Sequence, residues 1–334
     1  MGQSDHTHRP TQEREWANQV GPRDERASGT RDRNPARGLW ARLYRRPYLL
    51  LTLTMLMWGG NAVAGRLAVG EVSPMALTGL RWVVPVAVLG VALRYQLLTH
   101  RQVLLERWPS ILLMGTLGLT VFNALFYLAA HHTTAVNLTI LQGSMPVFVL
   151  VGALVFYGMR IHGWQIAGMA VTLLGALLVA TRADPGTLAS FSFNVGDLWM
   201  LAACCLYAGY TVALRSKPAV PGLVFFAALA GVALLTSLPL VAYEVVTGTV
   251  TWPTPRGWLI VLYVGLFPSF VSQVLFMRGV ELIGPGRAGL FVNLVPIFGA
   301  LLAVLILGEP FAPYHAVGLA LVLGGIWLAE RQPR

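Results

Sequence analysis

Two stretches of this chain share a pattern that decides how the fold is interpreted. Residues 142–158 read QGSMPVFVLVGALVFYG, and residues 292–308 read VNLVPIFGALLAVLILG. When the alignment is extended without gaps to 40 positions, nine are identical. The identical positions include Pro146/Pro296, Phe148/Phe298, Gly158/Gly308, Gly168/Gly318 and Gly175/Gly325. Apolar composition does not by itself align a proline and a Gly-x6-Gly spacing, so the sequence predicts two copies of one unit.

The composition indicates a membrane protein. Of the 334 residues, 56% are hydrophobic and 11% are charged, against about 25% charged in soluble domains. The mean hydropathy is +0.64. A soluble protein needs more charge to cover its surface. These values exclude a soluble enzyme, a nucleic-acid-binding domain and a disordered protein.

Ten apolar segments follow one another along the chain, and each has the length that a helix needs to cross a hydrocarbon core of about 30 Å. They lie at about 48–69, 74–93, 110–130, 134–156, 164–180, 196–214, 222–243, 257–277, 286–307 and 313–329. The predicted fold is an all-α integral membrane protein with ten transmembrane helices. Because each unit holds an odd number of helices, five, the two units must be inverted relative to each other, as in secondary transporters.

Positive charges between the segments predict the orientation. If the N-terminus is cytoplasmic, the short inner loops and the C-terminal residues carry ten Arg or Lys. The outer side carries three, namely Arg66, Arg182 and Arg256. Cytoplasmic loops are enriched in Lys and Arg, so both termini are expected in the cytoplasm.

The domain organisation follows from the same pattern. Residues 1–46 hold ten Arg and six acidic residues with few large apolar side chains, which predicts a disordered, Arg-rich cytoplasmic tail. Residues 47–181 and 196–331 are the two expected five-helix repeats, joined by an outer linker at 182–195. We expect the tail to be dispensable for folding.

Several short motifs resemble the drug/metabolite transporter superfamily, EamA type. The matching residues are Trp58-Gly59-Gly60-Asn61, Arg66, Leu80-Arg81, Pro146, Val295-Pro296 and Leu307-Gly308-Glu309. The resemblance covers about residues 48–331. It implies ten helices, cytoplasmic termini, a central cavity between the repeats and movement of small metabolites, often outward. The first repeat departs from the family pattern, because it reads Gly158-Met159-Arg160 where relatives often carry Gly-Glu.

Arg81 is the first candidate for substrate binding. It lies about eight residues into the second segment, where a charge is costly unless it faces a cavity or a partner. Its planar fork is suited to a substrate carboxylate or phosphate. The alternative is a structural role, in which Arg81 bonds to carbonyls freed by Pro85 four residues later.

Other residues are candidates for the cavity wall or for gating. Polar groups inside apolar segments bond across helices or line a pore, and paired prolines break helices where transporter sites lie. The cavity candidates besides Arg81 are Trp58, Asn61, Arg66, Asn123, Gln142, Tyr207, Tyr210, Gln273 and Asn293, and the helix-break or gating candidates are Pro146 and Pro296. We also expect Glu309-Pro310 to begin the following helix, and the two Gly-x6-Gly faces to pack against other helices.

The sequence favours a secondary transporter, working by alternating access, that exports a small polar, amino-acid-like metabolite across a bacterial inner membrane. No His-Glu-x-x-His, Gly-x-Ser-x-Gly or phosphate-gripping loop is present, so neither catalysis nor a role for ATP is expected. We expect no catalytic residue, metal or cofactor, no nucleic-acid partner, and a monomer or homodimer in the bilayer. The alternative is a non-transporting sensor or a membrane-embedded enzyme of unknown chemistry.

Overall fold

The computed structural model describes residues 44–158, 162–184, 186, 193–284, 288–289 and 291–329. In these ranges the chain is helical and has no strand. Residues 1–43 and part of the predicted linker lie outside the described residues, so the tail and the domain boundaries remain predictions.

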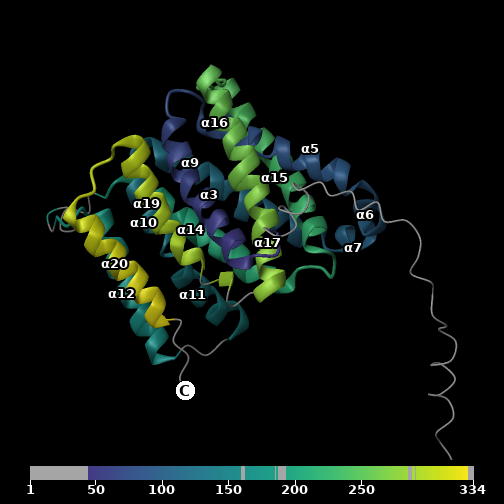
Figure 1. Cartoon of the computed structure of the whole chain (residues 1–334). Coiled ribbons are helices and arrows are strands. Elements are labelled where there is room, and N and C mark those ends of the chain that lie inside the picture. Colours follow the sequence, from purple (N-terminus) through teal and green to yellow (C-terminus); the bar gives the residue numbers. More distant parts are fainter. Residues whose placement is uncertain are drawn as a thin grey trace, which may run out of the picture. The chain divides into compact units, whose positions relative to one another are not determined.

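The first half of the chain forms helices in series, coloured purple to teal in Figure 1. Several predicted segments consist of two or three consecutive elements along one path. In chain order they are α3 (Pro47–Leu67), α4 (Pro74–Leu80) with α5 (Val83–Ala92), α8 (Trp108–Gly115) with the π-helix η1 (Thr116–Val121) and α9 (Phe122–His132), α10 (Ala135–Gln142) with α11 (Met145–Tyr157), and α12 (Gly163–Ala180).

The second half repeats this order of elements. The third segment of each half contains a π-helix, η1 in the first half and η3 in the second. The elements are α14 (Val195–Ala213) with the 3-10 helix η2 (Leu214–Ser216), α15 (Gly222–Val246), α16 (Pro255–Leu266) with η3 (Phe267–Val271) and α17 (Ser272–Ile283), the 3-10 turn η4 (Phe291–Asn293) with α19 (Leu294–Leu307), and α20 (Pro313–Ala329).

The helices coincide with the predicted apolar segments. Eight are long and apolar enough to cross a membrane, and two shorter apolar helices span Phe291–Leu307 and Pro313–Ala329. The prediction of an all-α membrane protein is therefore confirmed for the described residues. Two short helices were not predicted, α6 (Arg94–Thr99) and α7 (Arg101–Glu106), which connect α5 to α8 and have no buried residue.

Prolines accompany the helix interruptions. α4 ends at Leu80, and Arg81 and Trp82 form a turn before α5. Pro85 explains this turn, because a proline has no N–H to bond the carbonyl of the residue four positions earlier. Similarly, Gly143 and Ser144 form a turn directly before Pro146 at the start of α11.

The two Gly-x6-Gly faces pack against each other, which confirms their predicted role as packing faces. A Cβ added at Gly168 would lie 2.4 Å from the carbonyl oxygen of Gly325, and one at Gly175 would lie 2.8 Å from that of Gly318. The earlier glycine of α12 meets the later glycine of α20, and the later one meets the earlier, so the two helices run antiparallel. They lie side by side in Figure 1.

Close approach also holds α3 in the centre of the bundle. α3 packs against α19 and α17. A Cβ added at Gly59 would lie 2.7 Å from the backbone nitrogen of Gly299, and one at Gly299 would lie 2.1 Å from Thr139 Cγ2 on α10. Glycine thus lets the backbones of α3 and α19 come into contact, and lets the Thr139 side chain of α10 pack against Gly299 on α19.

Candidate functional site

Arg81 is the centre of a buried polar cluster. Its side chain leaves the turn between α4 and α5, and the residue is 4% exposed. Its Nε donates to Ser269 Oγ at 2.9 Å, and its Nη1 donates to Asn123 Oδ1 and, at 2.6 Å, to Tyr127 Oη. All three acceptors are neutral, and the described residues supply no carboxylate within ion-pair distance of Arg81.

Both π-helices contribute to this cluster. Asn123 follows η1 and donates its amide to the carbonyl of Leu119 inside η1 at 2.5 Å. Ser269 lies in η3 and donates to the carbonyl of Val264 at 2.7 Å. A π-helix leaves backbone carbonyls out of the regular ladder and often marks a functional site. Arg81 therefore joins the irregular segments of both halves.

Aromatic rings cover the guanidinium of Arg81. Its Cζ lies 5.4 Å from the Trp82 ring centre and 5.5 Å from that of Tyr127, within the range of cation–π attraction. Tyr127 in turn donates to Asn61 Oδ1 on α3 at 3.0 Å. The cluster therefore links α3, α9 and η3 around one cation.

Two donors beside this cluster remain unused. In the part of the chain that the structure describes, no acceptor bonds Arg81 Nη2, and the buried Trp82 Nε1 has no partner. A buried donor without a partner is costly, by about 1–3 kcal/mol. The unused donors thus give the cluster a capacity for a further acceptor.

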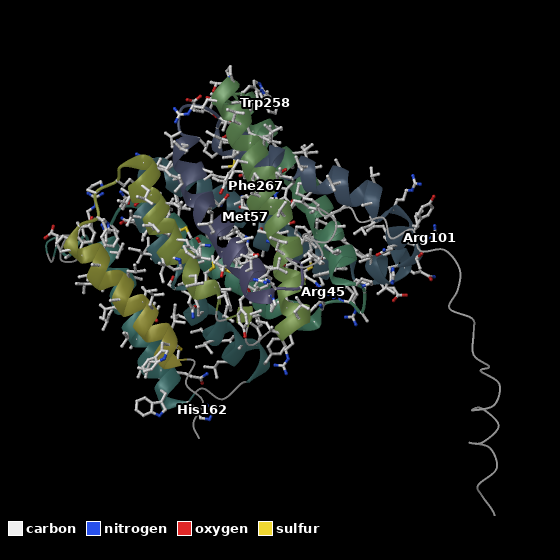
Figure 2. The ribbon with its side chains drawn as sticks, viewed as in Figure 1. Arg45, Met57, Arg101, His162, Trp258 and Phe267 are labelled. Carbon is white, nitrogen blue, oxygen red and sulfur yellow. The ribbon has the colours of Figure 1, made fainter. Side chains whose placement is uncertain are left out.

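One end of the helix bundle carries four acidic residues that hold helix ends and loops together. We call it the carboxylate end, defined by Glu71, Asp197, Glu244 and Glu309. In Figure 2, Trp258 near the start of α16 marks this end of the bundle, and His162 lies at the opposite end.

Glu244 and Glu309 cap helices that are distant in sequence. Glu244, at the end of α15, accepts from Ser73 Oγ at 2.5 Å and from the N–H groups of Met75 and Ala76 at 3.1 Å, at the start of α4. Carboxylates stabilise helix N-termini. Glu244 belongs to the second half of the chain and thus stabilises a helix of the first half, and Glu309 does the same for α10.

The prediction for Glu309 is wrong in its target. We expected Glu309 to lie at the start of the following helix, but that helix, α20, begins at Pro313. Glu309 instead accepts from the N–H groups of Ala135 and Val136 at 2.9 and 3.0 Å, at the start of α10. Packing of α19 beside α10 brings this distant N-terminus within reach.

Asp197 belongs to a second buried polar network. It lies in the first turn of α14, is fully buried, and accepts from Thr133 Oγ1 at 2.5 Å. Asn137 Nδ2 lies 3.4 and 3.5 Å from its two carboxylate oxygens. Asn137 also bonds His315 on α20 at 3.0 Å. Neither Asp197 nor His315 was a predicted site residue.

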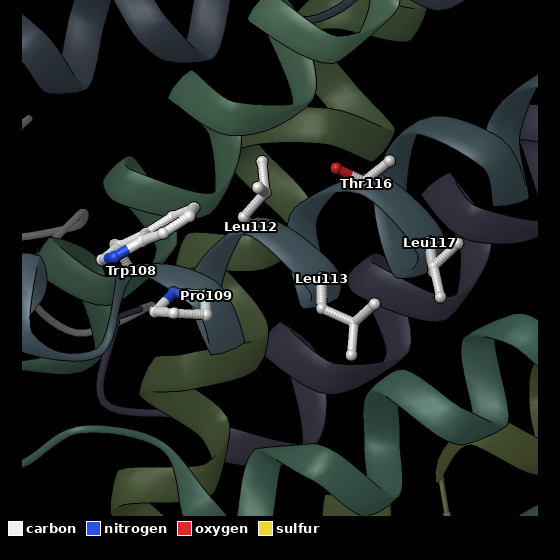
Figure 3. A pocket seen from close by; sticks show the side chains of 6 residues that line it. All are labelled: Trp108, Pro109, Leu112, Leu113, Thr116 and Leu117. Atoms are coloured by element: carbon white, nitrogen blue, oxygen red, sulfur yellow. The ribbon is translucent and has the colours of Figure 1, made fainter.

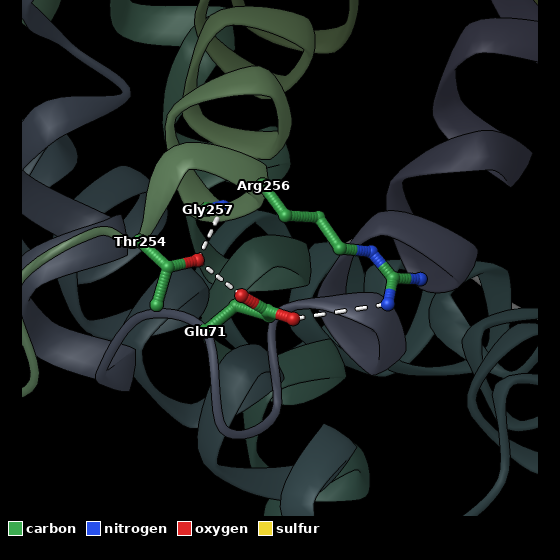
Figure 4. Close-up of polar contacts among 4 residues, drawn as sticks. All are labelled: Glu71, Thr254, Arg256 and Gly257. Carbon is green, nitrogen blue, oxygen red and sulfur yellow. Dashed lines mark hydrogen bonds and ion pairs between the residues drawn. The ribbon is translucent and has the colours of Figure 1, made fainter.

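Glu71 holds two loops together at the same end. It accepts from Thr254 Oγ1 and lies 3.7 Å from Arg256 Nη1, while Thr254 Oγ1 accepts from the N–H of Gly257 at 3.0 Å (Figure 4). Arg66 does not pair with Glu71. It donates to the carbonyl of Ala130 at 2.9 Å and so ties α3 to the end of α9.

The structure brings Arg81, Asn123 and Asn61 together and adds Tyr127 and Ser269, which the sequence analysis missed. Tyr127 lies one helical turn after Asn123, and this i, i+4 spacing is a signal that could have identified it. Ser269 gives no comparable signal, because it meets Arg81 across 188 residues.

The other predicted residues make no hydrogen bond with Arg81 in the part of the chain that the structure describes. Trp58 donates to Ser272 Oγ at 2.9 Å, and its ring lies 5.3 Å from that of Phe276. Tyr207 packs between Phe122 and Tyr210, with ring centres 4.9 and 5.3 Å away. The remaining predicted residues are Gln142, whose buried Oε1 has no partner among the described residues, Gln273 on α17, and Asn293 directly before α19.

A surface hollow of about 360 Å³ lies elsewhere on the molecule. Trp108, Pro109, Leu112, Leu113, Thr116 and Leu117 line it (Figure 3). These residues all belong to α8 and η1, and most are apolar. The hollow contains none of the predicted site residues, and its apolar wall suits contact with lipid.

Comparison with known proteins identifies relatives over most of the chain. The family described as EamA-like transporter family matches the chain twice, at residues 45–181 and 194–330. A solved crystal structure shares 22% identity and a TM-score of 0.60, covering 85% of this chain and 96% of the other. At this identity the likeness shows the fold alone.

Three relatives carry transporter names. A protein named uncharacterized transporter YyaM, from Bacillus subtilis, is 24% identical, and the match covers 85% of this chain and 93% of that protein. A protein named probable terminal-alkyne amino-acid exporter, from Streptantibioticus cattleyicolor, is 27% identical and covers 84% and 92%. A protein named probable amino-acid metabolite efflux pump, from Escherichia coli, is 24% identical and covers 85% and 94%.

Proposed function

Because the chain belongs to the EamA-like transporter family, we propose that it is a secondary transporter that exports a small, polar, amino-acid-like metabolite across the bacterial inner membrane. The family and the names of the relatives indicate a transporter and not an enzyme. Two relatives are named for the export of amino acids or their metabolites, which supports the proposed substrate class and direction.

The proposed architecture has ten membrane spans in two inverted five-helix repeats, residues 47–181 and 196–331, with both termini in the cytoplasm. The antiparallel packing of α12 and α20, the last helices of the two halves, supports the inversion. The shorter apolar helices are included, because 17 residues reach about 26 Å at 1.5 Å per residue. In this orientation the carboxylate end faces outward.

The observation that carries the proposed function is the Arg81 cluster. A buried guanidinium with neutral partners from both halves keeps a positive charge where the two repeats meet. A substrate carboxylate would supply the missing counter-charge and accept from Nη2, a charge-assisted bond. In alternating access the repeats move around such a central site, with Pro146 and Pro296 as the proposed gating positions.

The remaining predicted cavity residues would contact other parts of the substrate. Gln142 offers a buried oxygen without a partner among the described residues, Asn123 bonds Arg81 directly, and Asn61 is linked to Arg81 through Tyr127. Trp58, Tyr207 and Tyr210 would provide apolar walls for a side chain. This combination suits a molecule with a carboxylate and a modest apolar part.

Counterflow in proteoliposomes tests this function. Liposomes containing the purified full chain and an excess of unlabelled amino acids should accumulate labelled amino acids, whereas empty liposomes should not. Matched amines that lack the carboxylate should compete poorly, because they cannot bond Arg81. A sensor would give no counterflow, and equal competition by the amines would contradict the carboxylate contact. Metabolite profiling of cells that overproduce the protein would then name the exported compounds.

A further inference from the structure

Two buried titratable side chains meet at the carboxylate end, outside the Arg81 cluster. Asp197 is fully buried in the first turn of α14, and His315 is 3% exposed in the first turn of α20. Thr133 and Asn137 connect them from the end of α9 and the start of α10. The network thus joins two helices of the first half to two of the second.

The hydrogen bonds in this network have a defined direction. The backbone N–H of Ala312 donates to His315 Nδ1 at 3.0 Å, so Nδ1 is unprotonated and Nε2 carries the ring hydrogen. Nε2 then donates to Asn137 Oδ1 at 3.0 Å. The amide of Asn137 donates to Thr133 Oγ1 at 3.1 Å and points to the carboxylate, and Thr133 donates to Asp197 Oδ1.

Every donated hydrogen in this hydrogen-bond network therefore points toward Asp197. This arrangement stabilises an ionised carboxylate and a neutral imidazole. The N-terminus of α14 adds its partial positive charge, because Asp197 lies in its first turn.

The charged and titratable groups around the network give Asp197 no direct counter-ion. α9 contributes His131 and His132, and the ring of His132 packs against Trp199 at 5.0 Å. α12 is followed by the exposed Arg182 and Asp184. α19 is followed by Glu309, which is bonded to the start of α10. α20 adds Tyr314, whose ring lies 4.1 Å from that of His315. No ion pair reaches Asp197 within the described residues.

The hydrogen bonds and the helix N-terminus offset only part of the cost of this burial, because a buried carboxylate without a cation is costly to keep charged. We propose that Asp197 and His315 together form a proton-binding site, and that export of the metabolite is coupled to proton binding there. This inference rests on the proposed function. The ligand is a single proton, held either by the Asp197 carboxylate or by His315 Nδ1.

Binding of the proton disturbs the bonds that hold the helices. A proton on His315 Nδ1 faces the N–H of Ala312, and two donors cannot bond each other, so the contact at the start of α20 is lost. A proton on Asp197 removes the charge that strengthens the bonds from Thr133 and Asn137, because a hydrogen bond to an ionised group is about twice as strong as a neutral one. Either event loosens the joint between the halves at the proposed outer end.

This loosening is what an outward opening requires. In alternating access the two repeats separate at one end at a time, and the network joins α9 and α10 to α14 and α20 at this end. A proton taken up from outside would therefore favour the outward-open state, release of substrate, and return of the proton to the inside.

The experiment measures efflux of labelled amino acids from proteoliposomes containing the full chain, at equal pH and with the outside more acidic. Trapped pyranine reports the internal pH. With the gradient, the wild type should reach an outside-to-inside amino-acid ratio up to about tenfold higher per pH unit for one exchanged proton, and should acidify the lumen. Asp197→Asn, which keeps an acceptor for Thr133, should retain counterflow at equal pH and lose both effects of the gradient. His315→Gln should behave in the same way.

The matched control is Glu71→Gln, which removes a carboxylate at the same end but outside the network. It should keep the gradient dependence. Counterflow by the wild type without any gradient dependence, or full dependence in Asp197→Asn, overturns the proton site alone. No counterflow by the wild type refutes the proposed function, and the proton coupling with it.

A second measurement does not require the Asp197 variant to fold. Acidification of purified wild type should produce protonated-carboxyl infrared bands, of which the component from the buried Asp197 should shift in His315→Gln and stay in place in Glu71→Gln. A band that His315→Gln leaves unchanged, or no band at all, overturns the proposal.

Discussion

Arg81 and Asp197 are both buried charges without a counter-ion among the described residues, yet their surroundings differ. Arg81 lies at a turn between two helices and contacts segments near two π-helices. Asp197 lies in the first turn of a regular helix. The Nη2 of Arg81 bonds no acceptor among the described residues, whereas the Asp197 network uses its donors and ends on a histidine. The difference indicates two kinds of ligand, an anionic group for Arg81 and a proton for Asp197.

The largest expected effect comes from removing the Arg81 charge. Arg81→Ala should lower counterflow about 30-fold or more, because it removes a buried charge-assisted contact of about 2–5 kcal/mol. Arg81→Lys should lose about tenfold, since it keeps the charge but not the fork. Arg66→Ala should have a smaller effect, because Arg66 bonds a backbone carbonyl. Initial counterflow rates, normalised to protein in the membrane, provide the measurement.

Two outcomes would contradict the assignment of Arg81 as a substrate contact. Normal counterflow by Arg81→Ala would exclude the substrate contact. Failure of Arg81→Ala to accumulate in the membrane, with Arg81→Lys fully active, would favour a structural role for the charge.

The next largest effect concerns the helix that carries His315. Gly325→Ala should destabilise the protein by about 1–3 kcal/mol, because its Cβ would lie 2.3 Å from Thr172 Oγ1 and 2.6 Å from Thr172 N and from the carbonyl of Gly168. Gly324→Ala is the matched control, since a Cβ there meets nothing within 4 Å. Thermal melting in detergent should separate the two variants. Equal melting would show that this helix pair does not position α20.

A smaller effect on transport is expected from Tyr127→Phe. The hydroxyl accepts from Arg81 and donates to Asn61, and its loss leaves Arg81 with one acceptor fewer, at a cost of about 1 kcal/mol. Counterflow KM should rise about fivefold with the maximal rate nearly unchanged. The pH-gradient dependence should stay as in the wild type, because Tyr127 is outside the Asp197 network. A loss of gradient dependence in Tyr127→Phe would show that the Arg81 cluster and the Asp197 network act as one site.

The smallest effect is expected from Glu309→Gln. The amide keeps one oxygen for the start of α10 but loses the acceptor for the second N–H and the charge at the helix N-terminus, at a cost of about 1 kcal/mol. Thermal stability should fall slightly, and gradient-driven export should persist. Glu281→Gln is the control, because its exposed pair with Arg278 contributes little. Loss of gradient dependence in Glu309→Gln would indicate that Glu309, and not Asp197, binds the proton.

The positions of the helices could be predicted almost completely, because their cause is local. A run of about 20 apolar residues crosses the bilayer wherever it occurs, and the predicted segment at 74–93 matches the span Pro74–Ala92. The largest difference is at the predicted segment 257–277, where the observed span runs from Pro255 to Ile283.

The candidate site could be predicted only in part. Arg81 was identified because a charge deep in an apolar segment stands out. The sequence did not identify Asp197, because an acid at the edge of an apolar segment resembles any helix end. His315 likewise gives no local signal, and it meets Asn137 across 178 residues.

By itself, the sequence determined that the chain is a helical membrane protein, how its internal similarity divides it, and which residues carry unusual charge. These properties depend on hydrophobicity and length, which act residue by residue. Tertiary packing alone decided which groups meet: Arg81 with Ser269, Glu309 with α10 and Asp197 with Thr133 and Asn137. The physical reason is that a hydrogen bond depends on distances of about 3 Å, and only the packed helices bring residues so distant in sequence that close.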